Sequence, residues 1–167
     1  MTGFILLTGK QTVAKSAAIR QIVDLVGKEN CGGFFIEEVR ENGKRTGFKV
    51  VTLDGREAVL AELNLSSGKY KISPQVIDTL CVPILLQSSM IKKYIIIDEI
   101  GPILLQSENI KNTLLLLLND NKQVIGTVYN DSYPWLDNLK KRENVMLLDI
   151  NEGNKDTIPS VIQKMVK

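Results

Sequence analysis

Continuous apolar runs, each only a few residues long, recur along the chain between segments that have helical periodicity. Four of these runs occupy residues 4–7, 94–97, 124–127 and 144–149. A run in which apolar and polar residues do not alternate is typical of a strand buried on both faces, as in a parallel sheet. We therefore expect four buried strands at these positions.

Helix signals fill the stretches between the expected strands. Apolar residues recur at helical spacing after Lys15, and further helices are expected after Ser73, after Ser107 and from Asp156. Serine is a favoured helix N-cap, and Pro83 is expected to bend or divide the second helix because it lacks an amide donor. Strands that alternate with helices predict an α/β fold, with a mostly parallel central sheet flanked by helices.

An antiparallel hairpin is expected between the first and second buried strands. Two strand-like runs, residues 34–40 and 45–53, are joined by Glu41-Asn42-Gly43-Lys44. Asn-Gly between two such runs is the strongest short hairpin signal. A further short strand is expected at residues 57–63. The chain therefore combines a parallel sheet with an inserted hairpin.

The size and charge of the chain exclude several classes of protein. Its 167 residues suit one domain with a core of its own, and no repeat or linker divides residues 1–167. The formal net charge of +2 is too weak to favour nucleic acid or an anionic membrane. No apolar run has the length of a signal peptide or membrane span. We therefore expect a cytoplasmic protein that does not bind nucleic acid or membrane, and the sequence indicates no protein partner.

The residue types present limit the chemistry. The chain has no histidine, and its two cysteines, Cys31 and Cys81, lie far apart in the sequence. Without histidine there is no Ser-His or Cys-His nucleophile, and two distant cysteines make neither a zinc cluster nor a disulfide framework. Catalysis must therefore come from Lys, Ser, Asp, Glu, the backbone or a bound metal.

A candidate phosphate-binding loop follows the first expected strand. It reads Gly9-Lys10-Gln11-Thr12-Val13-Ala14-Lys15-Ser16, which has alanine where the Walker A pattern has its second glycine. A loop that turns into a helix N-terminus points several backbone N–H groups at a polyphosphate. Lys15 would then bind the β- and γ-phosphates of a nucleoside triphosphate, and the Ser16 hydroxyl would be a Mg²⁺ ligand. The alternative is a lysine at the start of an ordinary helix.

The second expected buried strand ends in a pair of acidic residues, Asp98 and Glu99. We expect this strand end to lie beside the phosphate loop. Asp98 would hold Mg²⁺ through a water molecule, and Glu99 would act as the general base that activates an attacking water. The alternative is that the strand ends in acidic residues only because the chain returns to solvent there.

Three segments carry a resemblance to a known enzyme family. They read Gly33-Phe34-Phe35-Ile36-Glu37-Glu38-Val39-Arg40, Gly43-Lys44-Arg45-Thr46-Gly47-Phe48 and Asp98-Glu99-Ile100-Gly101. With them, nearly the whole chain resembles the cancer-related nucleoside-triphosphatase family of small P-loop NTPases. The resemblance implies a P-loop NTPase fold and hydrolysis of ATP, GTP and other nucleoside triphosphates with Mg²⁺. It also matches family arginines with Arg40, Arg45 and Arg142, which either reach phosphates or form surface ion pairs.

The phosphate loop is where the chain departs from this family, whose loop reads close to Gly-x-Pro-Gly-Val-Gly-Lys-Thr-Thr. Gln11, Thr12 and Ala14 replace the proline and two glycines, and Ala17 replaces the last threonine. If Thr12 and Ala14 are held in the left-handed conformation that glycine permits, the strain costs roughly 1–2 kcal/mol per residue. We therefore expect residues 9–17 to bind nucleotide, with activity weakened by this strain.

Three functions remain open at this stage. The leading one is an NTP hydrolase in which Lys15 and Glu99 are catalytic. The second is a non-catalytic nucleotide-binding protein whose loop has decayed, and the third is a small-molecule kinase with a lid at residues 129–142. A phosphorylated acceptor, in place of free phosphate, would separate the kinase from the hydrolase.

Overall fold

The computed structural model describes residues 3–10 and 12–166. Its strands are β1 Gly3–Thr8, β2 Cys31–Glu41, β3 Lys44–Thr52, β4 Glu57–Leu63, β5 Tyr70–Ile72, β6 Tyr94–Ile100, β7 Gln123–Val128 and β8 Val145–Asp149. Its helices are α1 Thr12–Val26, α2 Pro74–Val76, α3 Val82–Ile91, α4 Glu108–Asn119, α5 Pro134–Lys140 and α6 Ile158–Val166. Short 3₁₀ turns lie at Lys28–Asn30 and Leu104–Gln106, and a π-helical turn (η2) lies at Ile77–Cys81.

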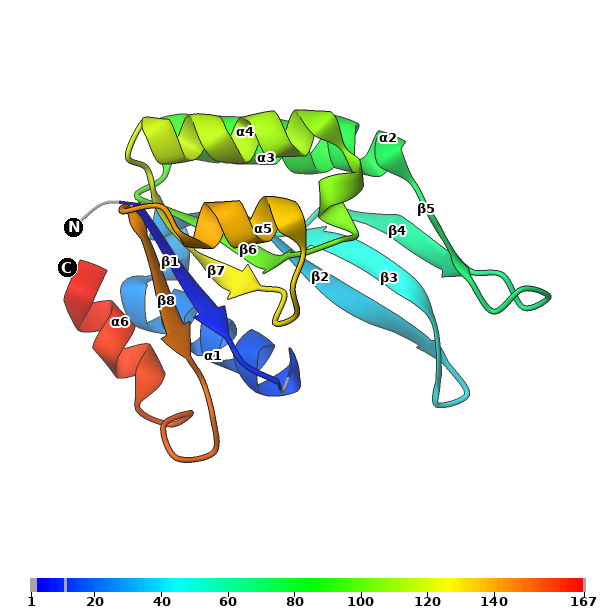
Figure 1. Cartoon of the computed structure of the whole chain (residues 1–167), viewed down its shortest axis with the longest axis horizontal. Helices are drawn as coiled ribbons and strands as arrows, with labels where there is room; N and C mark the ends of the chain where they lie inside the picture. Colours follow the sequence, from blue (N-terminus) through cyan, green and yellow to red (C-terminus); the bar gives the residue numbers. More distant parts are fainter. Residues whose placement is uncertain (1–2, 11, 167) are drawn as a thin grey trace.

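In the described residues these strands form an eight-stranded sheet in the order β5-β4-β3-β2-β6-β7-β1-β8 (Figure 1). The strands from β2 to β8 in this order pair in parallel, as the continuous apolar runs predict. Side chains along β1 alternate between two cores: Phe4 and Leu6 pack under α3, α4 and α5, whereas Ile5 and Leu7 pack against α1 and α6. The predicted α/β fold is confirmed.

The strand β2 differs from the prediction because it belongs to both parts of the sheet. Residues Cys31 to Phe35 pair in parallel with β6, and residues from Phe34 onward pair in antiparallel with β3. The Gly32-Gly33 pair conceals the first half of this strand in the sequence, since glycine is usually a turn signal. A side chain at Gly33 would lie 2.0 Å from the Ile96 carbonyl oxygen, so glycine is required for the close approach of the two strands.

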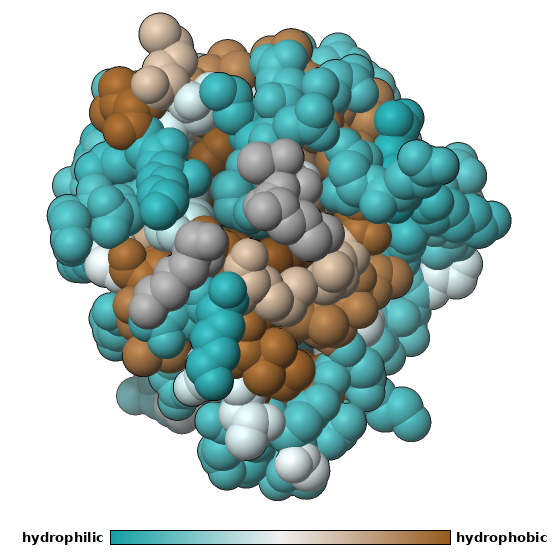
Figure 2. Space-filling model, turned by 90° about the vertical axis from the view of Figure 1, so that its left-hand side faces the viewer, coloured by the Kyte–Doolittle hydropathy of each residue, from teal (hydrophilic) through white to brown (hydrophobic). Residues whose placement is uncertain are grey.

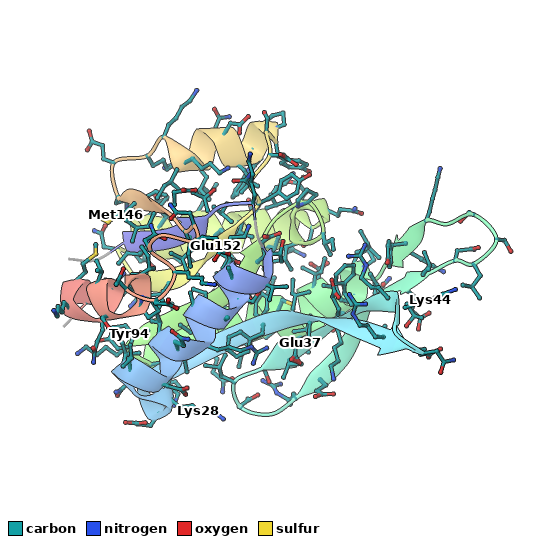
Figure 3. All side chains as sticks on the ribbon, turned by 90° about the horizontal axis from the view of Figure 1, so that it is seen from below. Lys28, Glu37, Lys44, Tyr94, Met146 and Glu152 are labelled. Carbon is teal, nitrogen blue, oxygen red and sulfur yellow. The ribbon has the colours of Figure 1, made fainter. Side chains whose placement is uncertain are left out.

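The strands β3, β4 and β5 form an antiparallel arm that extends β2 beyond the helices (Figure 3). Lys44 lies at the end of this arm, and Glu37 lies nearer to α1. The turn residues Asn42 and Gly43 have φ values of 51° and 78°, the left-handed pair that a two-residue hairpin turn requires. The predicted hairpin and the strand at residues 57–63 are confirmed, whereas β5 has only three residues and no sequence signal.

The helical stretch before β6 is interrupted as expected near Pro83. The Ser73 hydroxyl caps it by accepting a hydrogen bond from the Val76 amide, and the π-helical turn η2 separates α2 from α3. Its length and composition, over Pro74–Ile91, would suffice for a membrane span. The core helix of a soluble protein passes the same test, and Ile77 and Leu85 of this stretch are fully buried against the sheet.

The opposite end of the sheet, at β8, is an exposed edge near both termini (Figure 1). Figure 2 shows brown apolar residues interleaved with teal hydrophilic ones over this end of the molecule. Leu147 of β8 and Val161 of α6 are among the exposed apolar residues. Single exposed residues of this kind are normal on a folded protein.

Candidate functional site

The segment predicted to be a phosphate loop is partly helical. Its first glycine, Gly9, has a φ of +144°, and a side chain there would lie 2.5 Å from the Ile150 carbonyl oxygen. The helix α1 begins at Thr12, before the expected start at Lys15. The predicted strain at Thr12 and Ala14 is wrong, because both residues lie in the first turn of α1, a right-handed helix, and Ala14 is not among the described residues with a positive φ.

The substitutions themselves explain this difference. Glycine disfavours a helix by about 1 kcal/mol relative to alanine, so a loop that has lost its glycines gains helix propensity. A positive φ is also costly for a residue with a side chain. Winding Thr12 to Ala14 into α1 avoids that cost. Gln11, which the sequence also assigns to nucleotide binding, lies outside the described residues.

Lys15 connects α1 to the two central strands. Its side chain is only 2% exposed, and its Nζ donates hydrogen bonds to Glu99 Oε2 at 3.1 Å and to the Val128 carbonyl oxygen at 3.2 Å. The lysine of the predicted loop and the second carboxylate of the predicted strand end are therefore ion-paired.

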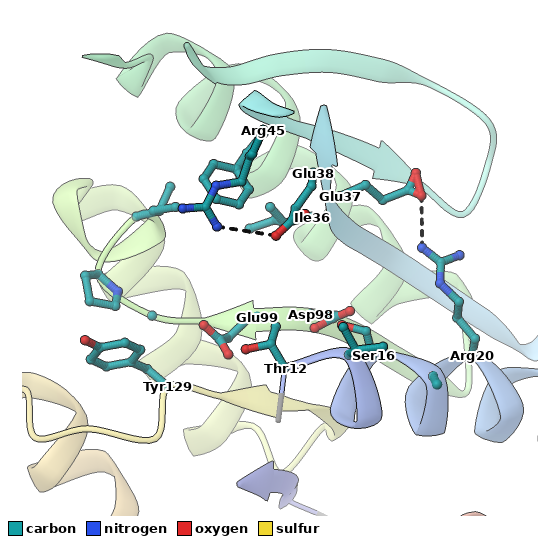
Figure 4. Close-up of a pocket in the computed structure, with 16 residues that line it drawn as sticks. Thr12, Ser16, Arg20, Ile36, Glu37, Glu38, Arg45, Asp98, Glu99 and Tyr129 are labelled. Atoms are coloured by element: carbon teal, nitrogen blue, oxygen red, sulfur yellow. Dashed lines mark hydrogen bonds and ion pairs between the residues drawn. The ribbon is translucent and has the colours of Figure 1, made fainter. Parts of the chain in front are cut away.

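The acidic strand end lies where the pairing of β6 is irregular. The pairing of β6 with β7 shifts register between Ile97 and Ile100, on either side of Asp98 and Glu99. Irregular pairing, as at a β-bulge, redirects side chains and is common beside active sites, and Figure 4 shows both carboxylates facing the same cleft. Lys15 of the loop lies 3.1 Å from Glu99 and Ser16 lines the same cleft as Asp98, as expected of a strand end beside the loop, although β7 separates β1 from β6 in the sheet. The Lys15 side chain spans that separation.

Asp98 is a buried carboxylate with one free oxygen. It is 3% exposed, and its Oδ1 accepts a hydrogen bond of 2.6 Å from the Thr127 hydroxyl. Its Oδ2 has no hydrogen-bond partner among the described residues. Burial raises the pKa of Asp98 above its usual range, and the Thr127 hydrogen bond, the nearby Ser16 hydroxyl and the charges of Arg20 and Lys15 offset part of that rise. A buried, unpartnered oxygen of this kind suits a cation.

Two cavities meet at this site. The larger one, called here the arm cleft, has a volume of about 730 Å³ and lies between α1 and the antiparallel arm (Figure 4). It is lined by Thr12, Val13, Ser16, Ala17, Arg20, Ile36, Glu37, Glu38, Arg45, Phe48, Asp98, Glu99, Gly101, Pro102, Ile103 and Tyr129. The smaller one, called here the loop cavity, has about 350 Å³ and is lined by Gly9, Lys10, Thr12, Lys15, Glu99, Tyr129, Asn130 and Asp131. Glu99 is thus a wall of both.

The structure separates the three family arginines. Arg45 lines the arm cleft, whereas Arg40 and Arg142 are absent from the described linings of both cavities. Arg40 instead binds Glu38, with its Nη2 2.7 Å from Oε2, and this hydrogen bond is the main reason that the pKa of Glu38 is lowered. Of the predicted loop residues, Ala14 is also absent from both linings.

Several residues of the site were not predicted from the sequence. Thr127 was given no role from the sequence, although it is fully buried and holds Asp98. Arg20 lies one helical turn after Ser16, so a helix-face argument would have placed it beside the same cleft. Phe48 and Tyr129 carry no local signal, because distant strands bring them to the cleft.

The donors present suit a hard cation that keeps other ligands. Within residues 3–10 and 12–166, no group of three or more His, Cys, Asp or Glu side chains is placed to hold a metal. Magnesium needs no such cage, since it is usually held by one or two protein oxygens together with waters and substrate phosphates. The free oxygen of Asp98 and the nearby Ser16 hydroxyl fit that requirement.

Comparisons with known proteins agree with this geometry. The sequence model of the NTPase family matches residues 4–163. The chain is 35% identical to the nucleoside-triphosphatase THEP1 of Thermotoga sp. (strain RQ2), over 98% of this chain and 95% of that protein. The crystal structure of THEP1 from Aquifex aeolicus matches with a TM-score of 0.85 and 27% identity, over 98% of this chain and 99% of that one. The solution structure of a human cancer-related nucleoside triphosphatase shares the fold, with a TM-score of 0.81 and 24% identity over 99% and 97%.

Proposed function

The chain belongs to the NTPase family and is a nucleoside-triphosphatase, and we propose that it hydrolyses its substrate as a magnesium complex bound between α1 and the Asp98-Glu99 strand end. One observation carries the proposal. A buried lysine from the degenerate loop, a buried carboxylate with a free oxygen and a second carboxylate that borders two cavities meet at one point. These are the charged groups that phosphoryl transfer requires.

The phosphates are placed in the loop cavity, at the N-terminus of α1. The first N–H groups of a helix have no partner within the helix, and they attract anions together with the helix dipole. Gly9 and Lys10 form the other side of this cavity. Winding Thr12 to Ala14 into α1 shortens the loop, so fewer loop amides surround the phosphates than in a full Walker A loop. Fewer donors should weaken nucleotide binding. The expectation of weak binding is therefore supported for a reason other than backbone strain.

The Ser16 hydroxyl and Asp98 would hold magnesium, with Asp98 acting through its free oxygen or a water. When bound, the metal neutralises charge that develops on the phosphate oxygens. Thr127 leaves Asp98 Oδ2 free by occupying Oδ1. The chain therefore contributes to the metal site an oriented carboxylate whose second oxygen is free to bind the metal or its water.

In this scheme Lys15 binds either Glu99 or the γ-phosphate, and Glu99 binds either Lys15 or the attacking water. In the structure they bind one another at 3.1 Å. A γ-phosphate in the loop cavity competes for Lys15, and Glu99 is then free to orient a water and accept its proton. The same lysine thus holds the base until substrate is present.

The remaining expectations follow from the same picture. We place the protein in the cytoplasm as a single P-loop domain, with a nucleoside triphosphate as its partner in place of nucleic acid or membrane. The formal charge of +2 is too weak to favour nucleic acid or an anionic membrane.

Thermal melts with ATP and GTP, each with and without Mg²⁺, test the binding step. A ligand at 100 times its Kd adds about 2.7 kcal/mol of apparent stability, so a clear Mg²⁺-dependent rise in Tm is expected. Lys15→Ala should abolish the rise, and Lys69→Ala, an exposed lysine of the arm, should not. Phosphate release measured on the same proteins tests hydrolysis. No rise in Tm at millimolar nucleotide for the wild type would refute the proposed site.

A further inference from the structure

The arm cleft and the loop cavity share Thr12, Glu99 and Tyr129, and the arm cleft extends from these residues toward the antiparallel arm. The loop cavity contains Gly9, Lys10 and Lys15, and none of these three lines the arm cleft. The arm cleft instead contains Ser16, Asp98 and Glu99. A general base stands beside the nucleophile, at the γ-phosphate end of the substrate. A molecule in the arm cleft therefore approaches the γ-phosphate from the nucleophile side.

The size of this cleft exceeds what the attacking water requires. One water occupies about 30 Å³, whereas the arm cleft measures about 730 Å³. Sites for organic ligands typically have about 300–1,000 Å³ and are lined mainly by apolar residues with a few polar groups. The cleft therefore has the dimensions of a site for a second, organic molecule.

The walls of the cleft suit a flat aromatic ligand. Val13 and Ala17 of α1 line the cleft together with Ile36 of β2, Phe48 of β3 and Tyr129, and Figure 4 shows Ile36 and Tyr129 on different sides of it. Val13 is 83% exposed although it is apolar and stands at the mouth of the site. Aliphatic and aromatic side chains on two opposing walls provide stacking surfaces for a planar ring.

The charges of the cleft disfavour a second, strongly anionic ligand beside the magnesium–NTP complex. Among the described lining residues the cations are Arg20 and Arg45, and the anions are Glu37, Glu38, Asp98 and Glu99. Each arginine is already paired, Arg20 with Glu37 at 3.0 Å and Arg45 with Glu38 at 3.3 Å. A phosphate or carboxylate in the cleft would meet more carboxylates than cations. A neutral molecule with hydrogen-bonding edges matches these paired ions better.

We propose that the arm cleft binds a nucleoside as a phosphoryl acceptor, so that the chain transfers phosphate to an alcohol in addition to hydrolysing NTP. The aromatic base lies between the two walls, and a ribose hydroxyl takes the place of the attacking water beside Glu99. The hydroxyl oxygen bonds to the γ-phosphorus, the bond to the β,γ-bridging oxygen breaks with its electron pair kept by the nucleoside diphosphate, and Glu99 accepts the hydroxyl proton. The products are a nucleoside monophosphate and a nucleoside diphosphate. This inference rests on the magnesium–NTP site proposed above.

The test uses the whole chain with Mg²⁺ and γ-labelled ATP. Adenosine, guanosine, cytidine and uridine are added one at a time at about 1 mM, a concentration at the upper end of usual KM values. Thin-layer separation distinguishes labelled nucleoside monophosphate from labelled free phosphate. We expect a labelled monophosphate with at least one of the four nucleosides, and its rate should saturate with nucleoside concentration.

Two variants locate the acceptor. Ile36→Trp fills the cleft and should lower transfer about tenfold or more, while phosphate release without nucleoside stays within about twofold of the wild type. Phe48→Ala removes a stacking surface and serves as a second variant if the tryptophan is not accommodated. Val59→Trp is the matched control, since Val59 is an exposed residue of β4 outside the described lining of the cleft.

The outcomes separate this inference from the proposed function. A wild type that releases phosphate but labels none of the four nucleosides overturns the acceptor site and leaves the hydrolase intact. Transfer that is unchanged in both Ile36→Trp and Phe48→Ala overturns the location of the acceptor. A wild type that neither releases nor transfers phosphate refutes the NTP site itself, and the acceptor site with it.

Discussion

The parallel half of the sheet and the antiparallel arm differ in the environment of their charged side chains. In the parallel half, the strands are covered by helices on both faces and charged side chains are scarce, yet Lys15 and Asp98 are almost fully buried. In the arm, charged residues are abundant, and pairs such as Lys49 with Glu57 are exposed to solvent. The same types of residue therefore have different energies in the two regions.

This difference indicates which charges have a function. An exposed ion pair contributes little to stability, about 0–1 kcal/mol. A buried charge is costly to maintain and persists where a partner or a ligand compensates it. The single unpartnered carboxylate oxygen of the described buried residues, on Asp98, lies in the parallel half. The arm contributes instead a wall of the cleft, made of ion pairs and aromatic rings.

The largest expected effect is that of Glu99→Gln. The amide cannot accept a proton, so phosphate release should fall by about 10²–10⁴-fold. Nucleotide affinity should stay the same or rise, because Lys15 loses the carboxylate with which phosphate competes. Single-turnover phosphate release and calorimetric titration measure the two effects. Glu57→Gln, the matched change in the arm, should alter neither, and equal loss in both variants would contradict the contrast between the regions.

A smaller effect is expected from Thr127→Val. The buried Asp98 Oδ1 would lose its hydrogen-bond donor, which costs about 1–3 kcal/mol of unfolding free energy. The reorganised carboxylate should also raise the Mg²⁺ concentration needed for nucleotide binding, whereas Thr127→Ser should restore it. Urea melts and Mg²⁺ titrations of nucleotide binding provide the two readouts. Thr46→Val, in the arm, removes a half-buried 3.3 Å hydrogen bond to the Val39 carbonyl and should affect only stability.

Glycine should lower the unfolding free energy in the first turn of α1 and raise it in the hairpin turn of the arm, relative to alanine. Ala14→Gly places glycine in the first turn of α1 and should lower the unfolding free energy by about 1 kcal/mol. Gly43→Ala removes glycine from a turn with a φ of +78° and should also destabilise, by about 1–2 kcal/mol. Thermal or urea melts of the two variants are sufficient. An Ala14→Gly variant more stable than the wild type would mean that this alanine is strained after all.

The smallest effect is expected at acid pH from Glu38→Gln. Hydrogen bonding to Arg40 lowers the pKa of Glu38 from its ordinary value of 4.5. Its contribution to stability is therefore present above about pH 4.5 and is lost as pH falls through the lower folded pKa. Because the pair is exposed, wild type and variant should differ by about 0.2–1 kcal/mol near pH 7 and converge once the pH has fallen below the lowered folded pKa. Urea melts across this range measure the difference, and one that grows toward low pH would contradict the sign.

Much of the fold could be predicted because its signals are local. The continuous apolar runs, the Asn42-Gly43 turn and the serine caps depend on neighbouring residues only, and the structure confirms all three. The first half of β2 could not be predicted in this way. Its glycines serve a close approach to β6, a strand about sixty residues later in the sequence.

The site was harder to predict than the fold, and its residue roles remain predictions. Lys15, Asp98 and Glu99 were found because their motifs are short and contiguous. The helical start at Thr12 was missed because the family pattern implied a loop, while the local propensity of the substituted residues favoured a helix. The arm cleft was missed because its walls come from α1, the arm and the segments after β6 and β7.

The continuity of β2 has a further consequence for the arm cleft. Within this one strand Phe35 pairs with Asp98 on β6 and with Val51 on β3, so the arm and the acidic strand end share a single hydrogen-bonded sheet. A hinge between them would have to break that ladder. The continuous sheet therefore fixes the width of the gap between the arm and the strand end. A flat ring fits into a gap of fixed width, whereas a thicker group does not.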